Sequence, residues 1–107
     1  MEEAFVSIGS NIDASKNMQA VKSHLSIFDE IRYSSIYTTP AEGFEGEDFL
    51  NCVCNFRTAK SPYDLRNLLK RVERDMGRTT SQKGMSSRVI DLDLILYGDL
   101  VVHDSEL

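Results

Sequence analysis

Two carboxylates stand two residues apart near the C-terminal end of the sequence, within an apolar run. Asp91 and Asp93 alternate there with Ile90, Leu92 and Leu94. In a β-strand, residues two apart point to the same face and lie about 6–7 Å apart, so these acids should be neighbours. Neighbouring anions repel each other unless a cation neutralises them, and Mg²⁺ accepts carboxylate oxygens as ligands. The pattern therefore predicts a divalent-cation site.

Arg88 stands three residues before Asp91 and suggests what the cation carries. Its guanidinium group offers several donors in a geometry that matches phosphate oxygens. Magnesium together with arginine is a usual combination around nucleotide phosphates, so we expect a nucleotide ligand. The motif is short, however, and an open sheet face also tolerates two solvated acids, which remains an alternative for the pair taken alone.

Composition limits the class of protein. The 107 residues suffice for one domain, and 41% hydrophobic with 27% charged residues is typical of a globular protein. A net charge of −5 disfavours a general nucleic-acid binder, because it would repel the phosphate backbone. The start lacks the features of a signal peptide, and no apolar run reaches the ~18 residues of a membrane span. We expect a cytoplasmic protein without nucleic-acid or membrane partners.

Alternating apolar residues and turn residues divide the sequence into strands and helices. Strands are expected over 4–9, 31–38, 49–56 and around Asp91, with a short hairpin return at Val101-Val102. A first helix is expected over about 14–27, capped by Asp13 or Ser15. A second helix should begin at Ser61-Pro62 and stop at Gly77. The acidic, glycine-containing segment 41–48 should be a surface loop.

This order predicts an α+β fold, a ferredoxin-like βαββαβ sandwich with an antiparallel sheet and two helices on one face. The other face of the sheet is then open. By alternation, Phe49, Asn51, Asp91 and Asp93 should converge on that open face. Cys52 and Cys54 should be reduced core residues, with a redox role as the second reading.

Several motifs, taken together and in this order, resemble a known enzyme family. They are Ile8-Gly9-Ser10-Asn11, Tyr37-Thr38-Thr39-Pro40, Phe49-Leu50-Asn51, Gly77-Arg78 and the run Arg88-Val89-Ile90-Asp91-Leu92-Asp93-Leu94. The family is 6-hydroxymethyl-7,8-dihydropterin pyrophosphokinase, which in folate synthesis moves a diphosphate group from ATP to a pterin alcohol. The resemblance implies ATP and hydroxymethyldihydropterin as the substrates.

The resemblance also implies roles on the nucleotide side. Asp91 and Asp93 would ligate two Mg²⁺ ions that bridge the ATP phosphates. Arg78 and Arg88 would contact the phosphates and stabilise charge during transfer, so they are the expected catalytic residues. Glu73 and Lys83 complete the expected nucleotide-binding set. Arg78 could also be an ordinary cation at a helix C-terminus, and Glu73 an ordinary surface acid.

On the pterin side, the resemblance implies that Phe49 stacks on the ring and that Asn51 hydrogen-bonds it. Thr39 and Pro40 would open the loop that lines this pocket. Each of these residues has an ordinary alternative. Phe49 could anchor its own loop, Asn51 could form a turn, and Thr39-Pro40 could simply stop a strand. Neither His24 nor His103 is expected to have a role.

The sequence also departs from the family. Its usual additional arginines and Trp-Gly-Pro-Arg run are reduced here to the final Arg88. The sequence ends at Leu107, before the family's Pro-His pair and Arg-x-Phe stretch. We therefore expect one pyrophosphokinase-like domain over 1–107 that lacks the family's C-terminal segment. Two interpretations stay open. The first is an active or weakly active enzyme, whose missing wall a second subunit of a homo-oligomer or a separate chain could supply. The second is a ferredoxin-like binding or assembly module that has lost turnover.

Overall fold

The computed structural model describes residues 1–40, 46–77 and 89–102. The strands and helices follow in the order β1 (Glu2–Ser10), α1 (Ala14–His24), β2 (Asp29–Tyr33), β3 (Tyr37–Thr39), β4 (Phe49–Thr58), α2 (Pro62–Asp75), β5 (Asp91–Tyr97) and β6 (Leu100–Val101). The strands form one sheet in the order β2-β4-β1-β5-β6, and β3 pairs with β4. All the pairings are antiparallel.

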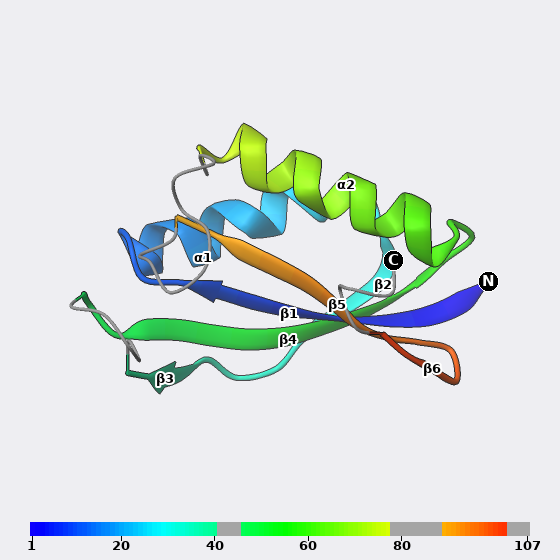
Figure 1. Ribbon diagram of the computed structural model, residues 1–107, viewed down its shortest axis with the longest axis horizontal. Coiled ribbons are helices and arrows are strands. Elements are labelled where there is room, and N and C mark those ends of the chain that lie inside the picture. Colours follow the sequence, from blue (N-terminus) through cyan, green and yellow to red (C-terminus); the bar gives the residue numbers. More distant parts are fainter. Residues whose placement is uncertain (41–45, 78–88, 103–107) are drawn as a thin grey trace.

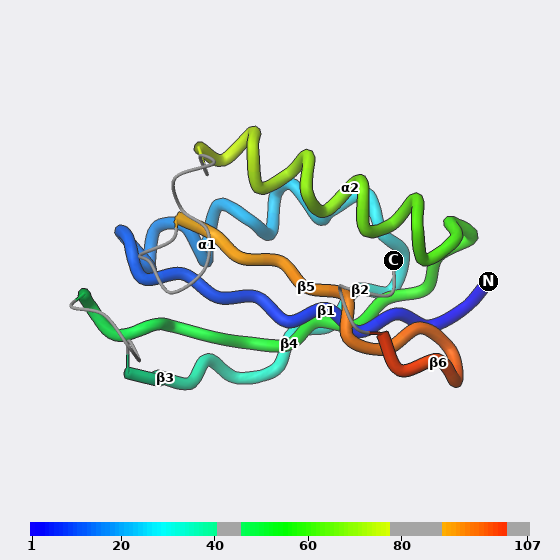
Figure 2. The backbone as a smooth tube through the Cα atoms, viewed as in Figure 1, coloured from blue at the N-terminus to red at the C-terminus, as the bar shows by residue number. Residues whose placement is uncertain are grey.

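Both helices cover the same side of the sheet, as Figure 1 shows. This arrangement confirms the expected α+β, ferredoxin-like fold with one covered and one open sheet face. The path of the backbone in Figure 2 shows β2 and β3 following one another along the same edge of β4. The hairpin return at Val101 is confirmed as β6, which follows a turn in which Gly98 has φ +55°.

The strand expected over 31–38 is two strands, which corrects the prediction. Tyr33 pairs with Cys54 and Tyr37 pairs with Asn51, so four positions on one side correspond to three on β4. One extra residue must therefore bulge out between β2 and β3. Ser34 keeps the chain attached to β4 there, because its backbone N–H donates to the Val53 carbonyl and its Oγ accepts from the Val53 N–H.

The two helices differ in how well their starts were predicted. In α2, Ser61 Oγ accepts from the backbone N–H of Asp64 at 3.1 Å and Pro62 occupies the first turn, as expected. In α1, Asp13 takes the cap position in a left-handed conformation, and its side chain makes no capping hydrogen bond to the described helix. The predicted cap residue is therefore confirmed as Asp13, but without the side-chain hydrogen bond expected of it. The predicted end at about 27 was also too late, since α1 ends at His24.

The core fills the layer between the sheet and the two helices. Its fully buried side chains alternate along the central strands, as with Val6 and Ile8 of β1 and Leu92 and Leu94 of β5. Cys52 and Cys54 lie in this core as free cysteines, which confirms their expected location. Burial, and secondarily the neighbouring Cys52, raises the pKa of the Cys54 thiol to about 12. Among the described residues, neither helix is long and apolar enough to cross a membrane.

Candidate functional site

The register of the sheet gathers polar residues on its open face. One row across the strands contains Tyr37, Asn51, Gly9 and Asp91, in the order β3, β4, β1, β5. The next row along β5 brings Asp93 opposite Ser7. Asp91 and Asp93 are partly buried and alternate with the core residues Leu92 and Leu94. The two acids therefore share the face opposite the helices, where the sequence placed them.

Gly9 leaves a gap between the acid pair and the predicted pterin residues. A Cβ atom at this position would lie 3.0 Å from Asn51 Oδ1 and 3.8 Å from Cδ1 of the Phe49 ring. Both side chains therefore border the space above Gly9. A glycine in the middle of a strand often marks such a close approach. The position above Gly9 therefore lies between the Asn51 amide and the Phe49 ring on β4 and Asp91 on β5.

Asn51 is held in one orientation by its neighbours. Its Nδ2 donates to Thr39 Oγ1 at 2.9 Å and also lies 3.5 Å from the carbonyl oxygens of Tyr37 and Phe49. Its Oδ1 is consequently turned toward Gly9 as an acceptor. Thr39 thus positions Asn51, while Pro40 directly follows β3 and is exposed. The reading of Asn51 as a turn former does not fit, because Asn51 lies within strand β4, whereas Phe49 is its first residue and could still anchor the preceding loop.

Ser10 and Asn11, at the end of β1, hydrogen-bond to the segments that lead into β5 and β4. Ser10 is fully buried, and its hydroxyl donates to the Val89 carbonyl just before β5. Asn11 is 3% exposed, and its Nδ2 donates to the Glu47 carbonyl at 3.0 Å, just before β4. One dipeptide therefore ties the start of the acid strand to the start of the Phe49 strand. The sequence alone did not indicate this role, although two buried polar residues at the end of a strand need such partners.

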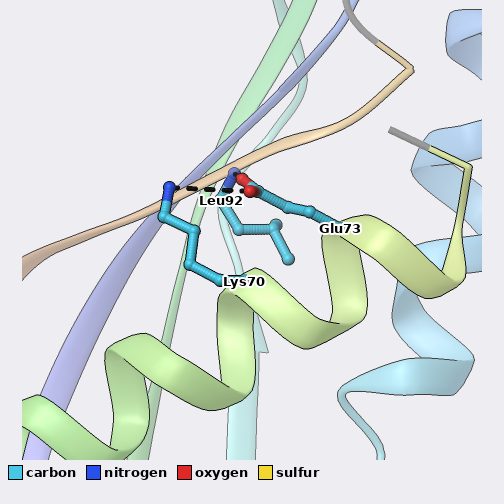
Figure 3. A network of polar contacts seen from close by, with 3 residues as sticks. All are labelled: Lys70, Glu73 and Leu92. Carbon is cyan, nitrogen blue, oxygen red and sulfur yellow. Dashed lines mark hydrogen bonds and ion pairs between the residues drawn. The ribbon is translucent and has the colours of Figure 1, made fainter. Parts of the chain in front are cut away.

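Glu73 of α2 supports the acid strand from the covered side (Figure 3). It is 3% exposed, so the alternative of a surface acid is wrong. Its Oε2 accepts from the backbone N–H of Leu92 at 2.6 Å, and its Oε1 lies 3.5 Å from Lys70 Nζ. Leu92 stands between Asp91 and Asp93, so this bond helps to fix the backbone that carries both acids. Its predicted contact with a nucleotide stays a prediction.

The predicted phosphate-binding cations lie outside the described residues. Arg78 directly follows Gly77, at the end of α2, and Arg88 directly precedes Val89. Lys83 lies between them in the sequence. The expected roles of these three residues stay predictions, as does the lack of a role for His103, which also falls outside the description.

The acid pair has the donor set of a magnesium site that a substrate completes. Within residues 1–40, 46–77 and 89–102, no group of three or more His, Cys, Asp or Glu side chains could hold a metal ion by itself. Mg²⁺ is commonly bound by one or two carboxylates, with phosphate oxygens and water supplying the other positions. Asp91 and Asp93 therefore fit this ion when a phosphate ligand accompanies it, and they would not form a closed zinc site.

Fold and site together define a ferredoxin-like α+β protein whose open sheet face joins a carboxylate pair to an aromatic ring and a fixed amide. Within this class, comparison with known families is specific. The family model described as 7,8-dihydro-6-hydroxymethylpterin-pyrophosphokinase (HPPK) matches residues 5–107. The chain belongs to this family, as the sequence motifs had indicated.

Individual relatives agree with the family. The chain is 31% identical to 2-amino-4-hydroxy-6-hydroxymethyldihydropteridine pyrophosphokinase of Aquifex aeolicus, with 96% of this chain and 66% of the relative covered. It is 30% identical to the protein of the same name from Haemophilus influenzae, with 100% of this chain and 69% of that relative covered. It is 34% identical to the mitochondrial folate synthesis bifunctional protein of Pisum sativum, with 99% of this chain and 21% of that relative covered. The chain thus spans about two thirds of the bacterial relatives and about a fifth of the plant protein.

Proposed function

We propose that this protein transfers a diphosphate group from ATP to 6-hydroxymethyl-7,8-dihydropterin, a step of folate synthesis. The row Asn51, Gly9, Asp91 carries the proposal, because it sets the Asn51 amide and the Phe49 ring, across a glycine, beside a carboxylate pair suited to a metal–phosphate complex. Family membership and the names of the bacterial relatives support the same reaction. We expect it to take place in the cytoplasm, where the sequence analysis placed the protein.

On the nucleotide side, Asp91 and Asp93 would hold Mg²⁺, and we propose two ions. Bound magnesium neutralises phosphate charge and orients the phosphates for in-line attack. Glu73 contributes from behind by keeping the Leu92 backbone, and hence both carboxylates, in place. Arg78, Lys83 and Arg88 would supply further positive charge around the phosphates. No protein nucleophile is required, since positioning and charge neutralisation dominate this type of reaction.

On the pterin side, Phe49 would stack on the ring and Asn51 would hydrogen-bond it. Because Asn51 Nδ2 is already bonded to Thr39, the free group facing the gap is Oδ1, which accepts. Asn51 should therefore recognise an N–H donor of the pterin. Thr39 acts as the positioning residue for this amide, and Pro40 would continue the pocket wall beyond β3.

The nucleotide half is tested by calorimetry with Mg²⁺ and a non-hydrolysable ATP analogue. The wild type should release binding heat, and Asp91→Asn combined with Asp93→Asn should abolish it. Asp99→Asn is the matched control, since Asp99 is exposed in the turn between β5 and β6. Equal binding by the double variant and the wild type would refute the metal site.

The pterin half is tested by fluorescence titration with hydroxymethylpterin. Gly9→Ala places a Cβ 3.0 Å from Asn51 Oδ1 and fills the gap, so affinity should fall about five- to tenfold. Binding of Mn²⁺ should be unchanged in this variant, which separates the two halves of the site. Pterin affinity equal to that of the wild type would remove the gap above Gly9 from the proposal.

Turnover distinguishes the enzyme from a binding module. A coupled assay that detects AMP release in the presence of ATP, Mg²⁺ and the pterin should show product with wild type and none with the double Asp variant. Binding of both ligands without AMP release, even at high protein concentration, would favour the binding or assembly module instead.

A homo-oligomer remains part of the proposal, because a second subunit could complete the pocket. Leu100 and Val101 of β6 are 51% and 58% exposed, and they offer an apolar surface beside the sheet. Sedimentation velocity would detect self-association, and a monomer at all concentrations would rule out a shared site.

A further inference from the structure

A cavity lies on the covered side of the sheet, on the face opposite the acid pair. Its volume is about 170 Å³, and it opens between α1 and the edge formed by β2, β3 and β4. Cys52 and Leu50 contribute to its wall from β4, and they alternate along that strand with Asn51, which faces the other side. The cavity is therefore separate from the proposed pterin and nucleotide pockets, although it lies directly behind one of their strands.

The cavity has an apolar floor and a polar rim. Met18 and Cys52 are buried at its base, with Leu50 and Tyr33 partly buried beside them. Lys22, on the exposed side of α1, is the one charged residue among those that line the cavity. Because Lys22 is the one charged residue in this lining, the local charge of the cavity favours an anionic ligand. Its floor favours an apolar body attached to that anion.

Tyr33 supplies an independent indication of a missing partner. Its ring faces Lys22, whose Nζ lies 5.0 Å from the ring centroid. Its hydroxyl is buried and has no hydrogen-bond partner among the described residues. Burial raises the pKa of Tyr33 to about 12, so the hydroxyl stays protonated and remains a donor at neutral pH. Buried donors without an acceptor are rare, and they often mark a site for a water or ligand.

We propose that this cavity binds a small one-ring aromatic carboxylate. Its ring would pack against Met18 and Leu50, and its oxygens would pair with the Lys22 ammonium and the Tyr33 hydroxyl. The size fits, because an apolar cavity of about 150 Å³ holds one benzene ring. This site goes beyond the proposed transferase function and does not depend on it, since none of its lining residues belongs to the acid pair or the pterin pocket.

The test is an NMR titration of the full chain with benzoate, using benzyl alcohol as a neutral probe of similar shape. Benzoate should cause saturable shifts in the amides around Met18, Lys22 and Cys52. Lys22→Met should weaken benzoate binding about fivefold, the limit expected for a partly exposed ion pair, and should leave benzyl alcohol unaffected. Lys16→Met is the matched control, because Lys16 is an exposed lysine of α1 that does not line the cavity.

Tyr33→Phe tests the second donor. Because the hydroxyl has no partner among the described residues, its removal should not lower stability toward urea, but it should weaken benzoate binding about fivefold. Three outcomes would overturn the proposal: no saturable shifts, shifts confined to the Asp91 face, or unchanged benzoate affinity in both Lys22→Met and Tyr33→Phe. Since Mn²⁺ and ATP binding are measured separately, failure here leaves the transferase proposal intact.

Discussion

The two faces of the central strands differ completely in what they carry. On the covered face, β1 and β5 place Val6, Ile8, Leu92 and Leu94 in the core, all essentially buried. On the open face, the positions next to these core residues include short and acidic ones, with Gly9 opposite Asp91 and Ser7 opposite Asp93. In each of these two strands, every second residue therefore packs in the core, and residues between them contribute to the candidate site. Substitutions one position apart should consequently separate stability from ligand binding.

The largest expected effect is on the covered face. Leu92→Ala leaves a cavity where a side chain is only 1% exposed, so the free energy of unfolding should fall by about 2–5 kcal/mol. Urea denaturation followed by circular dichroism measures this change. A loss below about 1 kcal/mol would mean that the core under α2 is loosely packed, and the contrast between the faces would be broken.

Glu73→Ala should have the next largest effect, because it leaves the buried Leu92 N–H without its acceptor. We expect a loss of about 1–3 kcal/mol in stability. It should also weaken Mn²⁺ binding at the acid pair, since the backbone of Leu92 carries both carboxylates. Glu73→Gln keeps an oxygen acceptor and should restore much of both properties. Equal losses in the two variants would show that the charge of Glu73, rather than the hydrogen bond, matters.

Alkaline pH should weaken the covered face selectively. The pKa of Cys54 is raised from 9.0 to about 12 in the folded chain, so between these values the unfolded thiol loses its proton while the folded thiol keeps it. Stability should therefore be unaffected by this group below pH 9 and should decrease above it, by at most about 1.4 kcal/mol per pH unit. Urea denaturation at increasing pH measures the slope, and Cys54→Ala should reduce it, while the raised pKa values of Cys52 and Tyr33 keep part of it.

The smallest expected effect on stability belongs to Asp93→Asn, on the open face next to Leu92. The change keeps the shape of a partly buried side chain, so stability should change by only about 0.5 kcal/mol. Mn²⁺ affinity should nevertheless drop markedly, because one of two carboxylate ligands is lost. Parallel urea and Mn²⁺ titrations of Asp93→Asn and Leu92→Ala give the sharpest form of the comparison. A large loss of stability in Asp93→Asn would show that the faces are not independent.

Local signals in the sequence were sufficient for several parts of the structure. The helix start at Ser61-Pro62 depends on residues that are close together in the sequence. The predicted cap is present, because Ser61 Oγ accepts from the backbone N–H of Asp64. The placement of Asn51 and the acid pair on one face required only alternation along strands and an antiparallel order. The two cysteines followed the same rule, and they are buried as expected.

Features that depend on distant partners were missed or only partly predicted. The bulge between Tyr33 and Tyr37 is set by the pairing with β4, which no local pattern encodes. Glu73 looked like an ordinary surface acid, because its burial follows from the packing of α2 against β5. Ser10 and Asn11 bind backbone groups far away in the sequence, so their structural role became visible only in the fold.

The hydrogen bond between Glu73 and Leu92 also affects self-association of the protein. The Leu92 N–H bonds to Glu73 and not to β1, and among the described residues the other border of β5 pairs only over residues 95–97, opposite 100–102. Within the part of the chain that the structure describes, the border around Leu92 has no strand partner, and such a border can recruit a strand from another molecule and start aggregation. A carboxylate that already occupies the N–H removes one anchor for such an incoming strand, so the residue that supports the acid pair also protects its strand from intermolecular β-pairing.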